Sequence, residues 1–131
     1  MADLSCGEFQ ETVSEYLIRH RSVLDVMSKL QEAGARVNRA VAKSVTSCGC
    51  LEVSAQKQKF PENATLADLK RMINSHISGE LCPECREALE TELGQMLFYI
   101  AALCAITGLD LDEIMMKEHD RLRMLGLFNL T

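Results

Sequence analysis

Apolar residues recur at helical spacing along residues 23–45, and this periodicity is the feature that most constrains the fold. Steps of three and four residues keep the apolar side chains on one stripe that can face a partner helix. No proline interrupts the segment, and residues 9–17 repeat the spacing. The stripe consists of Val23, Met27, Leu30, Gly34, Val37, Val41 and Val45. It predicts long helices, and no alternating strand pattern competes with it.

Capping residues divide the second half of the chain into three further helices. Thr65 is expected to cap a short helix whose apolar stripe runs from Leu66 to Ile77. Pro83 fits the first turn of a long helix that Gly108 ends, and Asp110 caps the last one. We therefore predict an all-α fold, a four- to five-helix bundle. It forms a single domain over residues 1–131, with an irregular, cysteine-containing connection around 46–64.

Composition narrows the function classes. The 131 residues carry a net charge of −5, which argues against nucleic acid as a partner. The N-terminal segment does not have the pattern of a secretory signal. The longest apolar stretch, Met96–Ile106, is shorter than the roughly 20 residues that span a bilayer. We expect no membrane association and a cytoplasmic location, where cysteines stay reduced.

Four of the six cysteines form two close pairs. Cys48 and Cys50 are separated by 31 residues from Cys82 and Cys85. Two pairs of thiols match what a tetrahedral, structural zinc site requires, because each pair supplies two ligands from one turn. The alternatives are a redox dithiol at Cys82 and Cys85 and inert, buried thiols.

Two short motifs carry a resemblance to a known family. Residues 92–98 read ELGQMLF and residues 108–114 read GLDLDEI, and LQEAGA at 30–35 precedes them. With these motifs the chain resembles the MazG-like, all-α nucleoside triphosphate pyrophosphohydrolases over roughly residues 23–43 and 84–123. The resemblance implies the all-α pyrophosphatase fold, a nucleotide as ligand and Mg²⁺ held by two pairs of carboxylates.

The carboxylates of that family are only half present. When the carboxylate positions of the family are matched to this sequence, the first pair corresponds to Glu32 and Ala35. The second pair corresponds to Glu92 and Gln95. Ala35 offers no ligand, and Gln95 offers only a neutral oxygen. The resemblance thus implies a degenerate Mg²⁺ site at Glu32, Glu92 and Gln95, with weak or absent hydrolysis and no assignable catalytic residue. The alternative is a non-catalytic, zinc-stabilised helical oligomer that binds a ligand or another protein.

Two further expectations concern surfaces. On the first long helix, Arg36, Arg39 and Lys43 share a face that could meet phosphate, with Asn38 at its border; a solvated, ion-paired face is the plainer interpretation. The segment Met96–Ile106 is apolar nearly all round, which predicts a homo-oligomer, with a dimer favoured and Phe98, Ala101 or Ala105 at the interface. The three histidines, at positions 20, 76 and 119, are expected at the surface.

Overall fold

The fold is helical, as the periodicity predicts. The structure is a computed structural model that describes residues 3–17 and 22–125, and His20 lies outside these ranges. In the described residues, the five α-helices are α1 (Cys6–Tyr16), α2 (Val23–Lys43), α3 (Leu66–Met72), α4 (Pro83–Thr107) and α5 (Leu111–Leu125). A π-helical turn, η1 (Ser44–Cys48), follows α2, and two short strands, β1 (Leu51–Val53) and β2 (Ile77–Gly79), flank α3.

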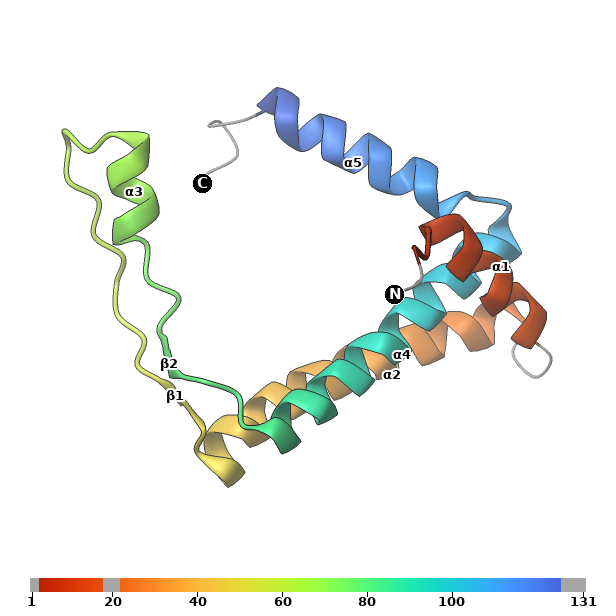
Figure 1. Cartoon of the computed structure of the whole chain (residues 1–131), viewed down its shortest axis with the longest axis horizontal. Coiled ribbons are helices and arrows are strands. Elements are labelled where there is room, and N and C mark those ends of the chain that lie inside the picture. Colours follow the sequence, from red (N-terminus) through yellow and green to blue (C-terminus); the bar gives the residue numbers. More distant parts are fainter. Residues whose placement is uncertain (1–2, 18–21, 126–131) are drawn as a thin grey trace.

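The two long helices α2 and α4 lie side by side and form the body of the molecule (Figure 1). The small helix α1 packs against α4 near its C-terminal end. The buried core lies where α1, α2 and α4 meet. Its central members are Val13, Val26, Ala101, Ala102 and Cys104. Burial of these side chains supplies the main favourable term for folding.

An arm projects from the other end of the α2–α4 pair (Figure 1). It comprises residues 50–81 and consists of β1, β2 and α3, and we call it the hairpin arm. The strands pair antiparallel, with Leu51 opposite Gly79 and Val53 opposite Ile77. Helix α3 begins at the expected capping box, in which Thr65 and Asp68 exchange hydrogen bonds.

The second strand corrects one expectation. The stripe from Leu66 to Ile77 predicted one helix, but α3 ends at Met72 and Ile77 lies in β2. A short apolar segment suits a helix or a strand about equally well by periodicity alone, and here pairing with β1 decides. Within the connection around 46–64 that was expected to be irregular, residues 51–53 form the short strand β1.

Helix α5 begins where the sequence placed it but contributes little to the core. The backbone N–H groups of Asp112 and Glu113 donate to the Asp110 carboxylate. The Gln10 side chain holds the preceding turn to α1, because it donates to the Leu109 carbonyl at 2.7 Å and accepts from the Leu111 N–H at 2.8 Å. Leu111 is the buried residue of this helix. Its apolar residues Ile114, Met115 and Leu122 are exposed.

One of the three residues expected at a subunit interface, Ala101, needs a second correction, whereas Phe98 and Ala105 are only partly buried. Ala101 is fully buried within the chain, and Phe98 and Ala105 pack against the same core. Helix α1 covers that side of α4, which the periodicity of α4 alone could not reveal. The large apolar residues of α4 that are exposed are instead Leu93 and Leu97. By length and composition, α4 is also the one helix in the described chain that could cross a membrane.

Candidate metal centre and the polar side of the α2–α4 pair

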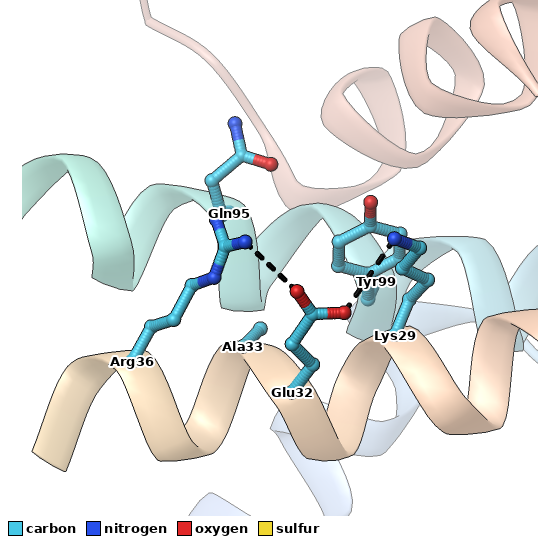
Figure 2. Close-up of a pocket in the computed structure, with 6 residues that line it drawn as sticks. All are labelled: Lys29, Glu32, Ala33, Arg36, Gln95 and Tyr99. Carbon is cyan, nitrogen blue, oxygen red and sulfur yellow. Dashed lines mark hydrogen bonds and ion pairs between the residues drawn. The ribbon is translucent and has the colours of Figure 1, made fainter. Parts of the chain in front are cut away.

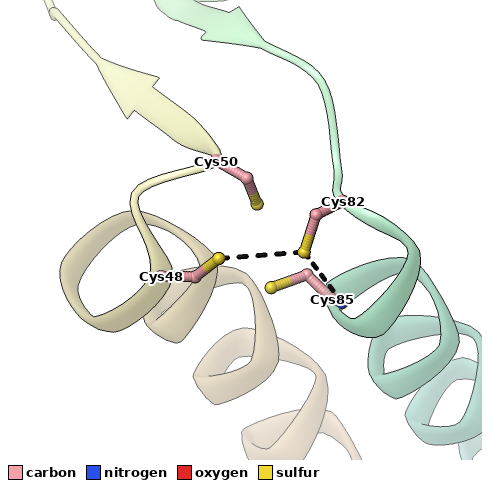
Figure 3. A group of neighbouring side chains, drawn as sticks. All are labelled: Cys48, Cys50, Cys82 and Cys85. Atoms are coloured by element: carbon pink, nitrogen blue, oxygen red, sulfur yellow. Dashed lines mark hydrogen bonds between the residues drawn. The ribbon is translucent and has the colours of Figure 1, made fainter.

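Four cysteines gather where the hairpin arm meets the α2–α4 pair (Figure 3). The Sγ atoms of Cys48, Cys50, Cys82 and Cys85 all lie within 4.8 Å of one another. The first two come from the segment that leaves α2, and the last two from the start of α4. Two segments far apart in the sequence therefore place four soft ligands around one point, a group that could hold a metal ion.

Local backbone geometry brings the first pair into position. The turn η1 widens the end of α2, and the Gly49 N–H donates to the Ser44 carbonyl at 2.9 Å. Gly49 has a φ of 82°, a left-handed conformation that glycine adopts without steric cost. The chain thus reverses between Cys48 and Cys50, and both sulfurs face the start of α4 (Figure 3).

The second pair is presented by the first turn of α4. Cys82 is the N-cap of this helix, and its sulfur accepts a hydrogen bond from the Cys85 N–H at 3.4 Å. Pro83 occupies the first helical turn, where its missing N–H is not needed. Cys82 and Cys85 are three residues apart, so their side chains lie on the same face of the first turn.

The pKa values of the clustered thiols are shifted in different directions. The backbone N–H and the thiol of Cys85 donate to Cys82 and lower its pKa to about 7. The pKa of Cys85 is correspondingly raised, first by its hydrogen bond to Cys82 and then by desolvation. For Cys48, the Cys50 N–H lowers the pKa, but its contacts with the Cys82 and Cys50 thiols outweigh this effect and leave the pKa raised. The cluster therefore favours one thiolate, at the helix N-terminus, where the dipole stabilises negative charge.

The positions at which the family resemblance implies Mg²⁺ ligands lie along one side of the α2–α4 pair. Glu32, Gln95 and Tyr99 line a small cavity of about 50 Å³ together with Lys29, Ala33 and Arg36 (Figure 2). Glu92 lines a neighbouring cavity of about 300 Å³, which shares Arg36 and also includes Arg39 and Lys43. The two cavities define what we call the polar side of the pair. Ala35 and Asn38 are exposed and line neither cavity.

The charges on this side are mainly positive. Arg36 donates to the Glu32 carboxylate at 2.8 Å, and the Lys29 ammonium lies 3.5 Å from it (Figure 2). Across both cavities, four cationic side chains face two carboxylates. In contrast, Glu92 Oε2 is buried and has no hydrogen-bond partner among the described residues. The polar side is thus suited to an anion, with one carboxylate oxygen still able to accept a hydrogen bond or a cation.

Sequence reasoning grouped the four cysteines, and it placed Glu32 and Gln95 on adjoining helices. It missed Lys29 as a partner of Glu32, although their spacing of three residues is a signal for an ion pair on a helix. His76 is partly buried in the hairpin arm, outside the cysteine group, and His119 is exposed. No model of a known protein family matches this chain, and no curated protein matches it at a significant level.

Proposed function

We propose that this protein is a zinc-stabilised helical module of MazG-like type that binds a phosphate-bearing ligand, such as a nucleotide, without hydrolysing it efficiently. The observation that carries the proposal is the charge of the polar side. Where a Mg²⁺-dependent hydrolase needs a cluster of carboxylates, Gln95 is neutral and Glu32 is already paired with two cations. Hard cations depend on anionic oxygens, so this environment disfavours Mg²⁺.

The same charges favour phosphate. Arg36, Arg39 and Lys43 follow one another along α2 and line the larger cavity. Guanidinium groups bind phosphate oxygens through paired hydrogen bonds, and lysine adds a point charge. The cavity of about 300 Å³ lies at the lower end of the range for small-molecule sites. Its dimensions suit part of a nucleotide, with the remainder in solvent.

Zinc is the metal that the cysteine group suits best. Four ligands at about 2.3 Å in a tetrahedron place neighbouring sulfurs about 3.8 Å apart. The Cys48 and Cys82 sulfurs are 3.7 Å apart. Four thiolates leave no position open for a substrate, so the role we assign to the metal is structural: it fastens the hairpin arm to the body. Tetrahedral sulfur sites also take iron, whose visible absorption distinguishes it.

A binding and hydrolysis experiment tests the proposal. Purified protein is titrated by calorimetry with a nucleoside triphosphate, a nucleoside monophosphate and inorganic phosphate, and pyrophosphate release is measured with and without Mg²⁺. We expect binding, no release, and weaker binding in Arg39→Gln. The matched control, Arg123→Gln, removes an exposed charge on α5 and should bind as the unchanged chain does. Absence of binding to all three ligands would refute the proposal.

A Mg²⁺-dependent pyrophosphohydrolase is the second candidate, and the unpartnered Glu92 Oε2 favours it. A buried carboxylate oxygen without a donor is costly, and a metal ion or a ligand N–H would remove that cost. Release of pyrophosphate at roughly 1 per second or faster would establish this candidate instead.

A further inference from the structure

We propose that the cysteine group is an oxidative modification site, at which a peroxide joins Cys48 to Cys82 through a disulfide and the metal is released. The inference rests on the zinc centre of the proposed function and does not depend on the ligand of the polar side. A redox pair at Cys82 and Cys85 is the alternative that the sequence suggests. The contacts and the exposure of the four sulfurs favour the pair that spans the base of the hairpin arm.

The sulfur atoms of Cys48 and Cys82 are already in contact (Figure 3). They lie 3.7 Å apart, whereas the sulfurs of a disulfide are about 2.05 Å apart. Small rotations of the two side chains can supply a closure of roughly 1.7 Å, the difference between these distances. All six cysteines of the chain are free thiols, so both partners are available.

Exposure decides which sulfur an oxidant reaches first. Cys48 is exposed, at the end of η1, whereas Cys50, Cys82 and Cys85 are partly buried. Oxidation of a cysteine follows its thiolate character and its exposure. Zinc holds each of its ligands as a thiolate, so exposure is the property that separates the four. Cys48 is therefore the residue that we expect the peroxide to attack.

The second thiolate of the reaction is the one that lies against Cys48. That thiolate is Cys82, at 3.7 Å. The Cys50 thiol instead donates to the Ser44 carbonyl, with 3.7 Å between sulfur and oxygen. Cys82 is also the N-cap of α4, where the Cys85 N–H donates to its sulfur and stabilises negative charge there. Position and charge thus both favour Cys82 as the partner of Cys48.

The reaction balances with hydrogen peroxide as the oxidant. The Cys48 thiolate attacks one peroxide oxygen, the O–O bond breaks, and Cys48 becomes a sulfenic acid while hydroxide leaves. The Cys82 thiolate then attacks the Cys48 sulfur, forms the S–S bond and expels a second hydroxide. The two thiolates have lost one electron each, and the peroxide has gained two. A metal-bound thiolate remains a nucleophile, although a slower one than a free thiolate.

Formation of this disulfide removes half of the metal's ligands. Only the Cys50 and Cys85 thiolates remain, whereas a structural zinc site has four ligands. Because zinc affinity depends on the thiolates that the folded chain supplies, the metal is released into solution. Reduction of the disulfide by a dithiol restores all four thiolates and, with them, zinc binding. The modification is therefore reversible.

The oxidised chain keeps the hairpin arm attached. Cys48 and Cys82 are 34 positions apart, on the two segments at which the arm begins and ends. A disulfide between them closes the same loop that the metal closes and restricts the unfolded chain in the same way. A disulfide between Cys82 and Cys85 would instead lie within one helical turn and leave the arm unfastened. Loss of the metal without release of the arm therefore distinguishes the proposed pair.

Peroxide treatment of the zinc-loaded full chain tests the inference. Released zinc is followed with a colorimetric chelator, and the disulfide is located by fragmentation of unreduced peptides in a mass spectrometer. We expect about one equivalent of zinc to be released for each Cys48–Cys82 disulfide. Dithiothreitol with added zinc should reverse both changes. The amide protons of β1 should keep their protection in the oxidised chain, because the disulfide holds the base of the arm.

Two double variants with equal numbers of thiols form a matched comparison. Cys50→Ser with Cys85→Ser keeps the proposed pair, and Cys48→Ser with Cys82→Ser keeps the other two ligands. Each variant has lost half of the zinc ligands, so a difference between them reports the pairing and not the metal. On addition of hydrogen peroxide, the first should form its intramolecular disulfide about tenfold faster or more. Circular dichroism verifies that both variants are helical.

Failure of the inference and failure of the zinc centre give different results. A protein that contains no zinc before treatment would overturn both the zinc centre and its oxidative release. When zinc is present, four results overturn the inference alone: no release by peroxide, a disulfide that joins Cys82 to Cys85, β1 amides that lose their protection on oxidation, or equal rates in the two double variants.

Discussion

The sulfur atoms of Cys48 and Cys82 lie 3.7 Å apart, although the two residues are 34 positions apart in the sequence. This contact joins the end of η1 to the N-cap of α4, and the whole hairpin arm lies between the two residues. A bond through a shared metal would thus close a loop of 33 intervening residues. Closing such a loop restricts the unfolded chain and holds the arm at the end of the body.

Replacing one ligand should release the arm before the body unfolds. In Cys82→Ser, we expect the protein to lose about one equivalent of zinc, and the amide protons of β1 to exchange faster. Amides at the centre of α2 should keep their protection, because Val26 and Ala33 remain buried against the rest of the core. Zinc content is measured by elemental analysis and exchange by mass spectrometry. Cys6→Ser, outside the cysteine group, is the matched control and should retain zinc.

The metal-free protein should have a distinct pattern of thiol reactivity. Because the thiolate is the nucleophile, and the pKa of Cys82 is lowered to about 7, alkylation of this residue should reach half its maximal rate near pH 7. Cys85, whose pKa is raised, should react only at much higher pH. Iodoacetamide labelling followed by peptide mass spectrometry measures both. Zinc-loaded protein should protect all four ligands, and equal labelling of Cys82 and Cys85 at pH 7 would contradict the arrangement.

The same lowered pKa fixes the sign of a pH effect on stability in the metal-free state. A thiol with a pKa of 9.0 when unfolded and about 7 when folded releases its proton more readily in the folded chain. Its contribution is therefore complete above pH 9 and is lost as the pH falls through 7. Urea unfolding of chelator-treated protein at pH 6 and at pH 9 measures this contribution. The part of the stability that the unchanged chain gains from Cys82 between pH 6 and pH 9 should be absent in Cys82→Ser.

Gly79 should be intolerant of a side chain. Its φ is 87°, and an added Cβ would lie closer than 3.0 Å to the carbonyl oxygen of Cys50, the residue just before the opposing strand β1. Gly79→Ala should therefore shift β1 and the adjacent metal ligand, with weaker zinc retention against a chelator. The left-handed backbone alone costs about 1–2 kcal/mol. Gly94→Ala is the control: it adds a methyl group to a helix in open space and should stabilise by about 0.5–1 kcal/mol.

A carboxylate at position 95 tests the proposed loss of the Mg²⁺ site. Gln95 and Glu32 line one cavity, so Gln95→Glu places a second anionic group beside Glu32. We expect Mg²⁺ affinity to increase several-fold in calorimetry, because hard cations prefer anionic oxygen ligands. Ala35→Glu, at an exposed position outside both cavities, should add little. If Gln95→Glu binds Mg²⁺ no better than the unchanged chain, the correspondence of the motifs is wrong.

The sequence by itself determined the elements that local chemistry governs. Helical periodicity predicted α1 and α2, and Thr65, Pro83 and Gly108 begin or end helices as expected, because capping and positive φ are properties of a few neighbouring residues. Spacing alone also grouped the four cysteines, since tetrahedral thiolate sites draw two ligands from each turn.

Only the tertiary structure decided which apolar face is covered. The sequence showed Met96–Ile106 as apolar nearly all round and predicted Ala101 among the interface residues, but Ala101 is buried where α1 packs on α4, whereas Leu97 is exposed. Likewise, Ile77 pairs with β1 instead of extending α3. In both cases the local pattern permits either outcome. Contacts between residues distant in the sequence select one of them, because burial depends on the neighbours that the rest of the chain supplies.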